Sequence, residues 1–104
     1  MSAEAIFTAL GEPVRRDLLE TIAAQGPQTA TELSRNFPIT RQAILKHLNV
    51  LEGAALVTVQ QQGRDKRYEL STAPLNELTA WVEAIGTRSE ERLQRLKAML
   101  ESEE

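Results

Sequence analysis

Apolar positions in the first part of the chain recur at intervals of three and four, the spacing that places side chains on one face of a helix. Residues 3–10, AEAIFTAL, carry Ile6 and Leu10 at this spacing. A second segment, PVRRDLLETIAA, begins at Pro13, a residue suited to the first turn of a helix, and stops before a Gly-Pro pair. The pattern therefore predicts two helices before residue 28.

A helix-turn-helix unit is predicted next. In TATELSRNF, residues 29–37, Thr29 and Glu32 have the spacing of a capping box, in which the hydroxyl and the carboxylate each accept a hydrogen bond from a free backbone amide. Pro38 ends this helix, because its ring disfavours a helical conformation at the preceding residue. Thr40 is a good N-cap for a further helix over residues 40–52. Two helices separated by so short a turn are typical of this unit.

The two faces of the 40–52 helix differ in chemistry. Ile44, Leu48 and Leu51 form a narrow apolar stripe, which we expect to face the core. The other positions are mostly polar: Gln42, Lys46 and Asn49 lie opposite the stripe, with Arg41 and Leu45 on one flank and His47 on the other. Amide and guanidinium groups can satisfy the edges of bases in a major groove, so this outer face is a candidate DNA-reading surface.

After Gly53 the periodicity changes from helical to alternating, which predicts a hairpin. Two strands fit the stretch LVTVQQQGRDKRYEL, with a turn at Gly63-Arg64-Asp65. Leu56, Val57, Tyr68 and Leu70 are expected to anchor the hairpin on the helices, while Arg64 and Lys66 project. Beside a helix-turn-helix, residues 60–68 would form a wing whose arginine reaches phosphates or a minor groove.

The C-terminal segment, residues 73–101, is a candidate dimerisation element. Leu75, Leu78, Val82 and Ile85 are spaced three, four and three apart, as in the seam of paired helices. The next apolar group begins at Leu93, eight residues after Ile85. This interval predicts a bend or change of register near Gly86, and therefore two helices rather than one.

Composition limits the classes of function. A chain of 104 residues predicts a single domain spanning 1–104, mostly α with a β-hairpin wing. The absence of cysteine excludes disulfides, zinc-thiolate sites and thiol chemistry, and a single histidine cannot furnish a selective metal site, so we expect no metal or cofactor. Without a long apolar run or a secretory signal at the amino terminus, a cytoplasmic protein with no membrane association is expected.

The distribution of charge favours an anionic partner although the net charge is −3. Residues 35–67 contain six basic and two acidic side chains, whereas the segments before and after them are acidic. One basic face on an acidic protein is compatible with double-stranded DNA as the partner.

Several alternatives remain open from the residues alone. The outer face of the 40–52 helix could contact a protein rather than DNA, which would make the chain a winged-helix interaction module. An enzyme using Glu83, Glu90 and Glu91 lacks a nucleophile, a phosphate loop or a metal motif. Arg15 and Arg16 could contact phosphate or form salt bridges, and Trp81 could pack in an interface or line a small-molecule pocket.

The joint pattern resembles the ArsR family of winged-helix transcriptional repressors. The resemblance rests on FTALGEPVRRDLLETIA, TATELSRNFPITRQAILKHLNVLEGAALV and QQGRDKRYEL, and extends over roughly residues 5–82. It implies a homodimer that binds a palindromic operator, often upstream of its own gene, and dissociates in response to a signal. The positions that would contact DNA are Thr40, Arg41, Gln42, Leu45, Lys46 and His47 in the helix and Arg64 in the wing, to which the projecting Lys66 is added.

Metal-sensing members of that family carry cysteine motifs on the third helix, or Asp, His and Glu ligands on the last helix. This chain has TELSR in the third helix, and its last helix contains neither histidine nor aspartate. The resemblance therefore supports DNA binding without metal regulation, and the identity of any inducer is unknown.

Overall fold

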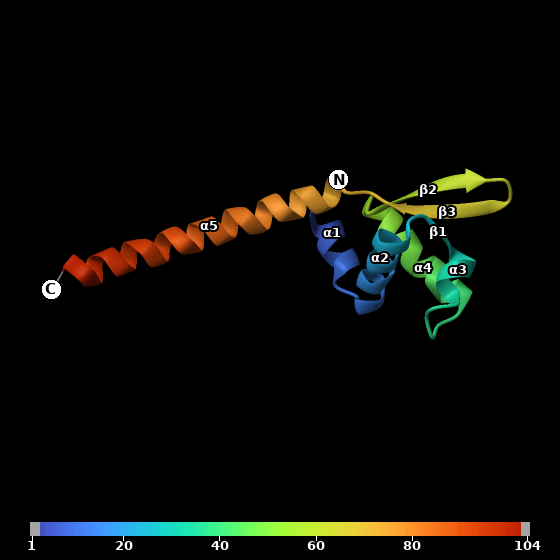
Figure 1. Cartoon of the computed structure of the whole chain (residues 1–104), viewed down its shortest axis with the longest axis horizontal. Helices are drawn as coiled ribbons and strands as arrows, with labels where there is room; N and C mark the ends of the chain where they lie inside the picture. The colour runs from blue at the N-terminus through green and yellow to red at the C-terminus, as the bar shows by residue number, and fades with distance from the viewer. Residues whose placement is uncertain (1–2, 103–104) are drawn as a thin grey trace.

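The computed structural model describes residues 3–102, which form five helices and a small sheet (Figure 1). In chain order the elements are α1 (Ala3–Leu10), α2 (Pro13–Gln25), β1 (Gln28–Thr29), α3 (Ala30–Ser34), α4 (Arg41–Gly53), β2 (Val57–Gln62), β3 (Asp65–Leu70) and α5 (Ala73–Ser102). The predicted fold class, mostly helical with a β-hairpin wing and a long C-terminal helix, is confirmed.

The core is aliphatic and lies where α2, α3 and α4 meet the base of the hairpin. Its fully buried side chains include Leu18, Ile22, Leu33, Ile44, Leu48, Leu51, Leu56 and Val57. The stripe predicted for the 40–52 helix is thus the buried face of α4. Tyr68 adds an aromatic ring from β3, and Leu70 is half-buried against the same cluster.

The sheet has one strand more than the predicted hairpin. Its order is β1-β3-β2, with both pairs antiparallel; Val57 pairs with Leu70 in the hairpin, and Gln28 pairs with Tyr68 on the other edge of β3. A two-residue strand shows no alternation, so β1 leaves no pattern in the sequence. The two-residue turn Gly63-Arg64 places φ of Gly63 at +62°, a conformation that glycine adopts without steric cost.

The prediction that the third helix reaches Phe37 is wrong, because α3 ends at Ser34. The amides of Arg35 and Asn36 bond the carbonyls of Glu32 and Leu33, three residues back, so the chain tightens and leaves the helix before Pro38. Phe37 nevertheless packs against the core from the turn.

Only half of the predicted capping box forms at this helix. Thr29 accepts a hydrogen bond from the Glu32 amide at 3.0 Å, as predicted. The Glu32 carboxylate turns instead to Arg67 on the hairpin, with an N–O distance of 3.3 Å. This ion pair links α3 to the wing.

The predicted bend near Gly86 is also wrong, because α5 is one continuous helix of 30 residues. On a straight helix, each residue advances by about 100°, so eight residues turn Leu93 only about 80° from Ile85. The apolar face therefore continues through the gap without a change of register. A seven-residue repeat, which would require supercoiling, is not the repeat of this helix.

α5 extends far beyond the rest of the molecule, as Figure 1 shows. Its first turns contact α1, where the rings of Phe7 and Trp81 meet edge to face with centroids 5.1 Å apart. From residue 79 to residue 101 every side chain is exposed. The apolar residues of this helix are therefore largely uncovered in a single copy of the chain.

Candidate nucleic-acid interface

α4 presents a fixed outer face because both its start and its inner face are anchored. The Thr40 hydroxyl accepts a hydrogen bond from the Ala43 amide at 3.1 Å, which satisfies one of the free donors of the first turn. Ile44, Leu48 and Leu51 have no exposed surface. Gln42, Lys46 and Asn49 are all exposed, as the sequence predicts, and Val50 is the apolar residue that α4 exposes beside them.

A groove of about 380 Å³ separates α4 from the hairpin. Its lining comes from the β1–α3 junction, from α4 and from the hairpin: Thr29, Ala30, Thr31, Arg41, Leu45, Asn49, Arg64, Asp65, Lys66 and Tyr68. Four of the eight predicted site residues, namely Arg41, Leu45, Arg64 and Lys66, thus meet in one concave surface. Three of them are cations, and Asp65 is the acidic side chain of the lining.

Arg41 is held in place by α3. Its Nε donates to the Thr31 hydroxyl at 3.1 Å, so its terminal nitrogens remain available to a ligand. Tyr68 lies nearby, and burial raises the pKa of its hydroxyl above the ordinary value of 10.0; the negative charge of Glu52 acts in the same direction and Arg41 in the opposite one.

His47 is half-buried on the flank of α4 that contacts α2. The guanidinium of Arg15 lies 3.4 Å from His47 Nδ1. Since arginine can only donate, a hydrogen bond between the two groups requires Nδ1 to accept. His47 therefore contacts Arg15 and lies outside the groove.

The two arginines whose roles were open, Arg15 and Arg16, close the C-terminal end of α1. Arg15 donates from Nε to the Ala9 carbonyl at 2.7 Å and from a terminal nitrogen to the Thr8 carbonyl at 3.0 Å. Arg16 donates to the Leu10 carbonyl at 2.6 Å. Both satisfy carbonyls that have no partner within the helix and place positive charge at its negative end.

Gln42, Lys46 and His47 lie on α4, and Thr40 is its N-cap; none of the four is in the groove lining. The predicted residues thus divide between the groove and the adjoining part of the helix. Sequence reasoning missed Thr31, which holds Arg41, and Tyr68 as part of the groove floor. No sequence pattern indicates the role of Thr31, because its contact with Arg41 depends on how α3 crosses α4.

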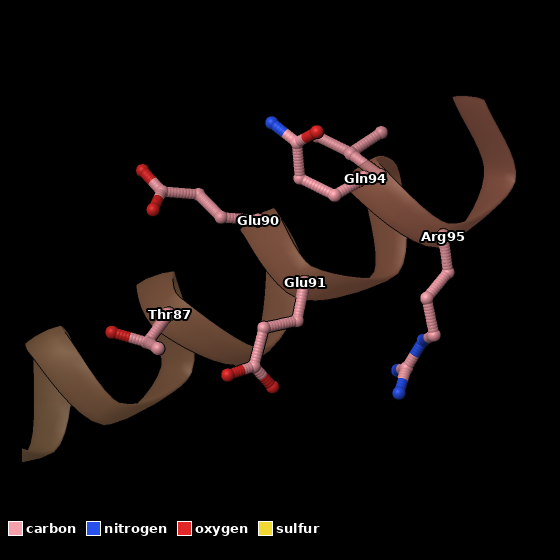
Figure 2. A pocket seen from close by; sticks show the side chains of 6 residues that line it. Thr87, Glu90, Glu91, Gln94 and Arg95 are labelled. Carbon is pink, nitrogen blue, oxygen red and sulfur yellow. The ribbon is translucent and has the colours of Figure 1, made fainter. Parts of the chain in front are cut away.

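A second hollow lies along the exposed part of α5. Figure 2 shows that its labelled side chains, Thr87, Glu90, Glu91, Gln94 and Arg95, all come from one helix. Glu90 and Glu91 point to different sides of that helix, so they do not converge as an acid and a base would. Within residues 3–102 there is also no group of three or more His, Asp or Glu side chains that could hold a metal ion.

Comparisons with known proteins agree with this geometry. Residues 10–60 match a family model described as a helix-turn-helix domain. The HTH-type transcriptional regulator YuzN of Bacillus subtilis (strain 168) is 40% identical over 77% of this chain and 95% of its own length. The transcriptional repressor SdpR of the same organism is 30% identical over 74% of this chain and 84% of its own length.

A solved structure, the ArsR-like transcriptional regulator from Rhodococcus sp. RHA1, superposes with a TM-score of 0.85 at 35% identity and covers 95% of this chain and 90% of that one. The chain belongs to the ArsR family. This ArsR-family protein is a DNA-binding transcriptional regulator with the winged-helix fold. Among its described helices, none combines the length and apolar character needed to cross a membrane.

Proposed function

We propose that this regulator is a homodimeric repressor that binds a palindromic operator, with its own promoter as a target. The observation that carries the proposal is the groove between α4 and the wing, in which Arg41, Arg64 and Lys66 converge beside the exposed polar face of α4. A helix with such a face fits a major groove, and a basic hairpin beside it meets the adjoining backbone or minor groove. Occupation of the promoter then excludes transcription.

Each residue of the interface has a role that follows from its chemistry. Arg41, Gln42 and Lys46 supply donors to base edges or phosphates, and Leu45 offers an apolar contact such as a thymine methyl group. Thr40 keeps a hydroxyl hydrogen for a phosphate while it caps α4, and His47 can donate from Nε2. Arg64 and Lys66 place positive charge at the wing tip, where both are exposed.

A dimer is supported by the uncovered apolar surface of α5. Trp81, Val82, Ile85, Leu93, Leu96 and Leu100 all expose more than 40% of their surface in a single copy. A twofold dimer would present two α4 helices to successive turns of a palindrome, with centres about 34 Å apart.

The proposal is tested by charge removal in the groove and, as a control, on the distal part of α5. Arg41→Ala and Arg64→Ala should each weaken binding to the upstream DNA, and each lost phosphate contact should reduce the salt dependence of log K by about 0.9. Arg95→Ala removes the same charge from α5 and should leave both quantities unchanged. Unchanged affinity in both groove variants would show that the groove does not bind DNA.

The second candidate is a winged-helix module that contacts a protein through the same face. It requires weak salt dependence and no preference among DNA sequences. We assign the protein no enzymatic activity and no cofactor, since the relatives reported above are transcriptional regulators. Because its ligand is chromosomal DNA, we place its action in the cytoplasm, and the inducer has no assigned identity.

A further inference from the structure

We propose that Glu32 and Arg67 are positioning residues of the DNA interface, which hold the wing at the angle to α4 that operator binding requires. The inference rests on the proposed DNA-binding function and deepens it. It assigns a role to Arg67, the third cation of the hairpin, which is not part of the groove lining. Three observations carry it: the face on which Arg67 lies, the two partners of its side chain, and the exposure of the hairpin beyond it.

Arg67 lies on the face of the hairpin that points away from the groove. Successive side chains of a strand point to opposite faces, and both neighbours of Arg67 in β3, Lys66 and Tyr68, line the groove. The side chain of Arg67 therefore lies on the other face. It is half-buried there, whereas Arg64 and Lys66 are exposed. Arg67 thus presents no charge to a ligand in the groove.

The guanidinium of Arg67 joins two elements that are far apart in the sequence. One terminal nitrogen lies 3.3 Å from the Glu32 carboxylate on α3. Nε donates to Gln62 Oε1 at 3.1 Å, and Gln62 is the last residue of β2 before the turn. We call Glu32, Arg67 and Gln62 the wing joint. The backbone of Arg67 supports this joint, because it pairs with Thr29 of β1, directly before α3.

The half of the hairpin beyond the wing joint is exposed. Every residue from 60 to 66 is exposed, and Figure 1 shows the turn of the hairpin projecting past the helices. The side-chain hydrogen bonds of Gln60 and Gln61 stay within the hairpin. Among residues 3–102, the ion pair that joins this half to a helix is Arg67–Glu32. A two-stranded ribbon is only marginally stable alone, so the place of the tip depends on the joint.

The wing joint decides where the groove cations lie. Arg64 is in the turn and Lys66 directly precedes the joint, so a rotation of the hairpin about its base displaces both. Arg41, the groove cation of α4, is bonded to Thr31, the neighbour of Glu32 in α3. Adjacent residues of α3 thus hold the cations of both walls of the groove. A wing held in this way is already in position when DNA arrives, and binding avoids the entropic cost of ordering it.

Glu32→Ala tests the ion pair, because charge alone predicts the opposite result. Removal of a carboxylate from a DNA-binding protein ordinarily strengthens its binding to a polyanion. Loss of the wing joint should instead raise the dissociation constant for the upstream DNA by about threefold to fivefold, the effect of one half-buried ion pair. Tighter or unchanged binding by Glu32→Ala would overturn the proposal.

The matched control is Glu69→Ala. Glu69 lies on the same face of β3 as Arg67, two residues away, but it accepts a hydrogen bond from Gln60 within the hairpin and has no link to α3 among the described contacts. This variant removes the same charge and should not weaken binding. A loss of affinity equal to that of Glu32→Ala would assign the effect to the hairpin surface in general and overturn the role of the joint.

Arg67→Gln separates a positioning residue from a phosphate contact. Affinity should fall while the salt dependence of log K stays as in the unmodified protein. A salt slope lower by about 0.9 would identify Arg67 as a phosphate contact and overturn the assignment. Combined with Glu32→Ala, the variant should cost no more than the larger single change, because both break one contact; additive losses would contradict the joint.

Amide hydrogen exchange of the free protein measures the wing joint without DNA. Glu32→Ala should speed exchange of the amides between residues 60 and 67 by about threefold to fivefold and leave the core amides of α2 and α4 unchanged. Unchanged exchange in the hairpin, or an equal increase in the core, would overturn the positioning role. Failure of the unmodified protein to bind its upstream DNA would instead contradict the proposed function, so the two failures are distinguishable.

Discussion

Replacement of Arg15 by alanine distinguishes a structural arginine from one that contacts DNA. Arg15 makes two hydrogen bonds to the last carbonyls of α1, and one of them is partly buried. A hydrogen bond from a charged donor contributes about 1.5–3 kcal/mol to folding stability when it is shielded from solvent, and clearly less when it is exposed. The partly buried hydrogen bond to the Ala9 carbonyl supplies most of this stabilisation, so we expect Arg15→Ala to lower the free energy of unfolding by about 2 kcal/mol.

The matched variant is Arg16→Ala, which removes one exposed bond to the Leu10 carbonyl and should cost less than about 1 kcal/mol. Urea denaturation at one fixed protein concentration measures both. For a small domain with a slope of about 1–2 kcal/mol per molar, the urea midpoint of Arg15→Ala should fall by about 1–2 M.

The same two variants are then titrated with DNA over a range of salt concentrations. If Arg15 acts only through α1 and His47, the salt dependence of binding should match that of the unmodified protein. An unchanged urea midpoint together with a salt slope lower by about 0.9 would refute this reasoning, because it would identify Arg15 as a phosphate contact.

Three further outcomes are expected. Thr40→Ala removes the N-cap bond to Ala43 and should lower the free energy of unfolding by about 1 kcal/mol, measured in urea; no change would exclude the cap. Ala55 has φ of +57°, a strained value outside glycine, so Ala55→Gly should raise the melting temperature, with a stabilisation of about 0.5–1 kcal/mol; a lower melting temperature would contradict this. The raised pKa of Tyr68 means that the folded state holds the hydroxyl proton more tightly than the unfolded state does. The contribution of this group to the free energy of unfolding is therefore complete below about pH 10 and is lost as the pH rises further. Tyr68→Phe should remove that part of the alkaline destabilisation in urea titrations at pH 9 to 11, and an identical alkaline loss in the variant would exclude it.

Elements with strong periodicity were predictable from the sequence. The apolar intervals located α1, α2 and α4 to within a residue or two, and alternation located the hairpin. Thr29 and Thr40 were correctly identified as N-caps, because each precedes an apolar helical pattern. Such elements are encoded locally, so a short window of sequence is enough to predict them.

Elements that depend on distant contacts were not predictable. β1 is a strand only because β3 lies beside it, and the end of α3 depends on a tightening of its last turn. The apolar residues of α5 indicate a break only against a seven-residue repeat, which a straight helix does not follow.

The sequence was enough to predict which residues belong to the candidate interface, but not how they are arranged in space. The sequence predicts Arg41, Leu45, Arg64 and Lys66 as site residues, and the fold brings them into one groove. The bond that holds Arg41 to Thr31 and the contact of Arg15 with His47 join residues from different helices. No pattern within one segment indicates either contact.

We propose that this protein recognises its own promoter as a metal-independent repressor. The most direct measurement is binding of the purified protein to its upstream DNA and to an unrelated fragment of equal length, over a salt series, with and without a chelator. We expect a preference for the upstream fragment that falls steeply with salt and is unaffected by the chelator. Equal and weak binding to both fragments would show that the protein does not recognise its own promoter.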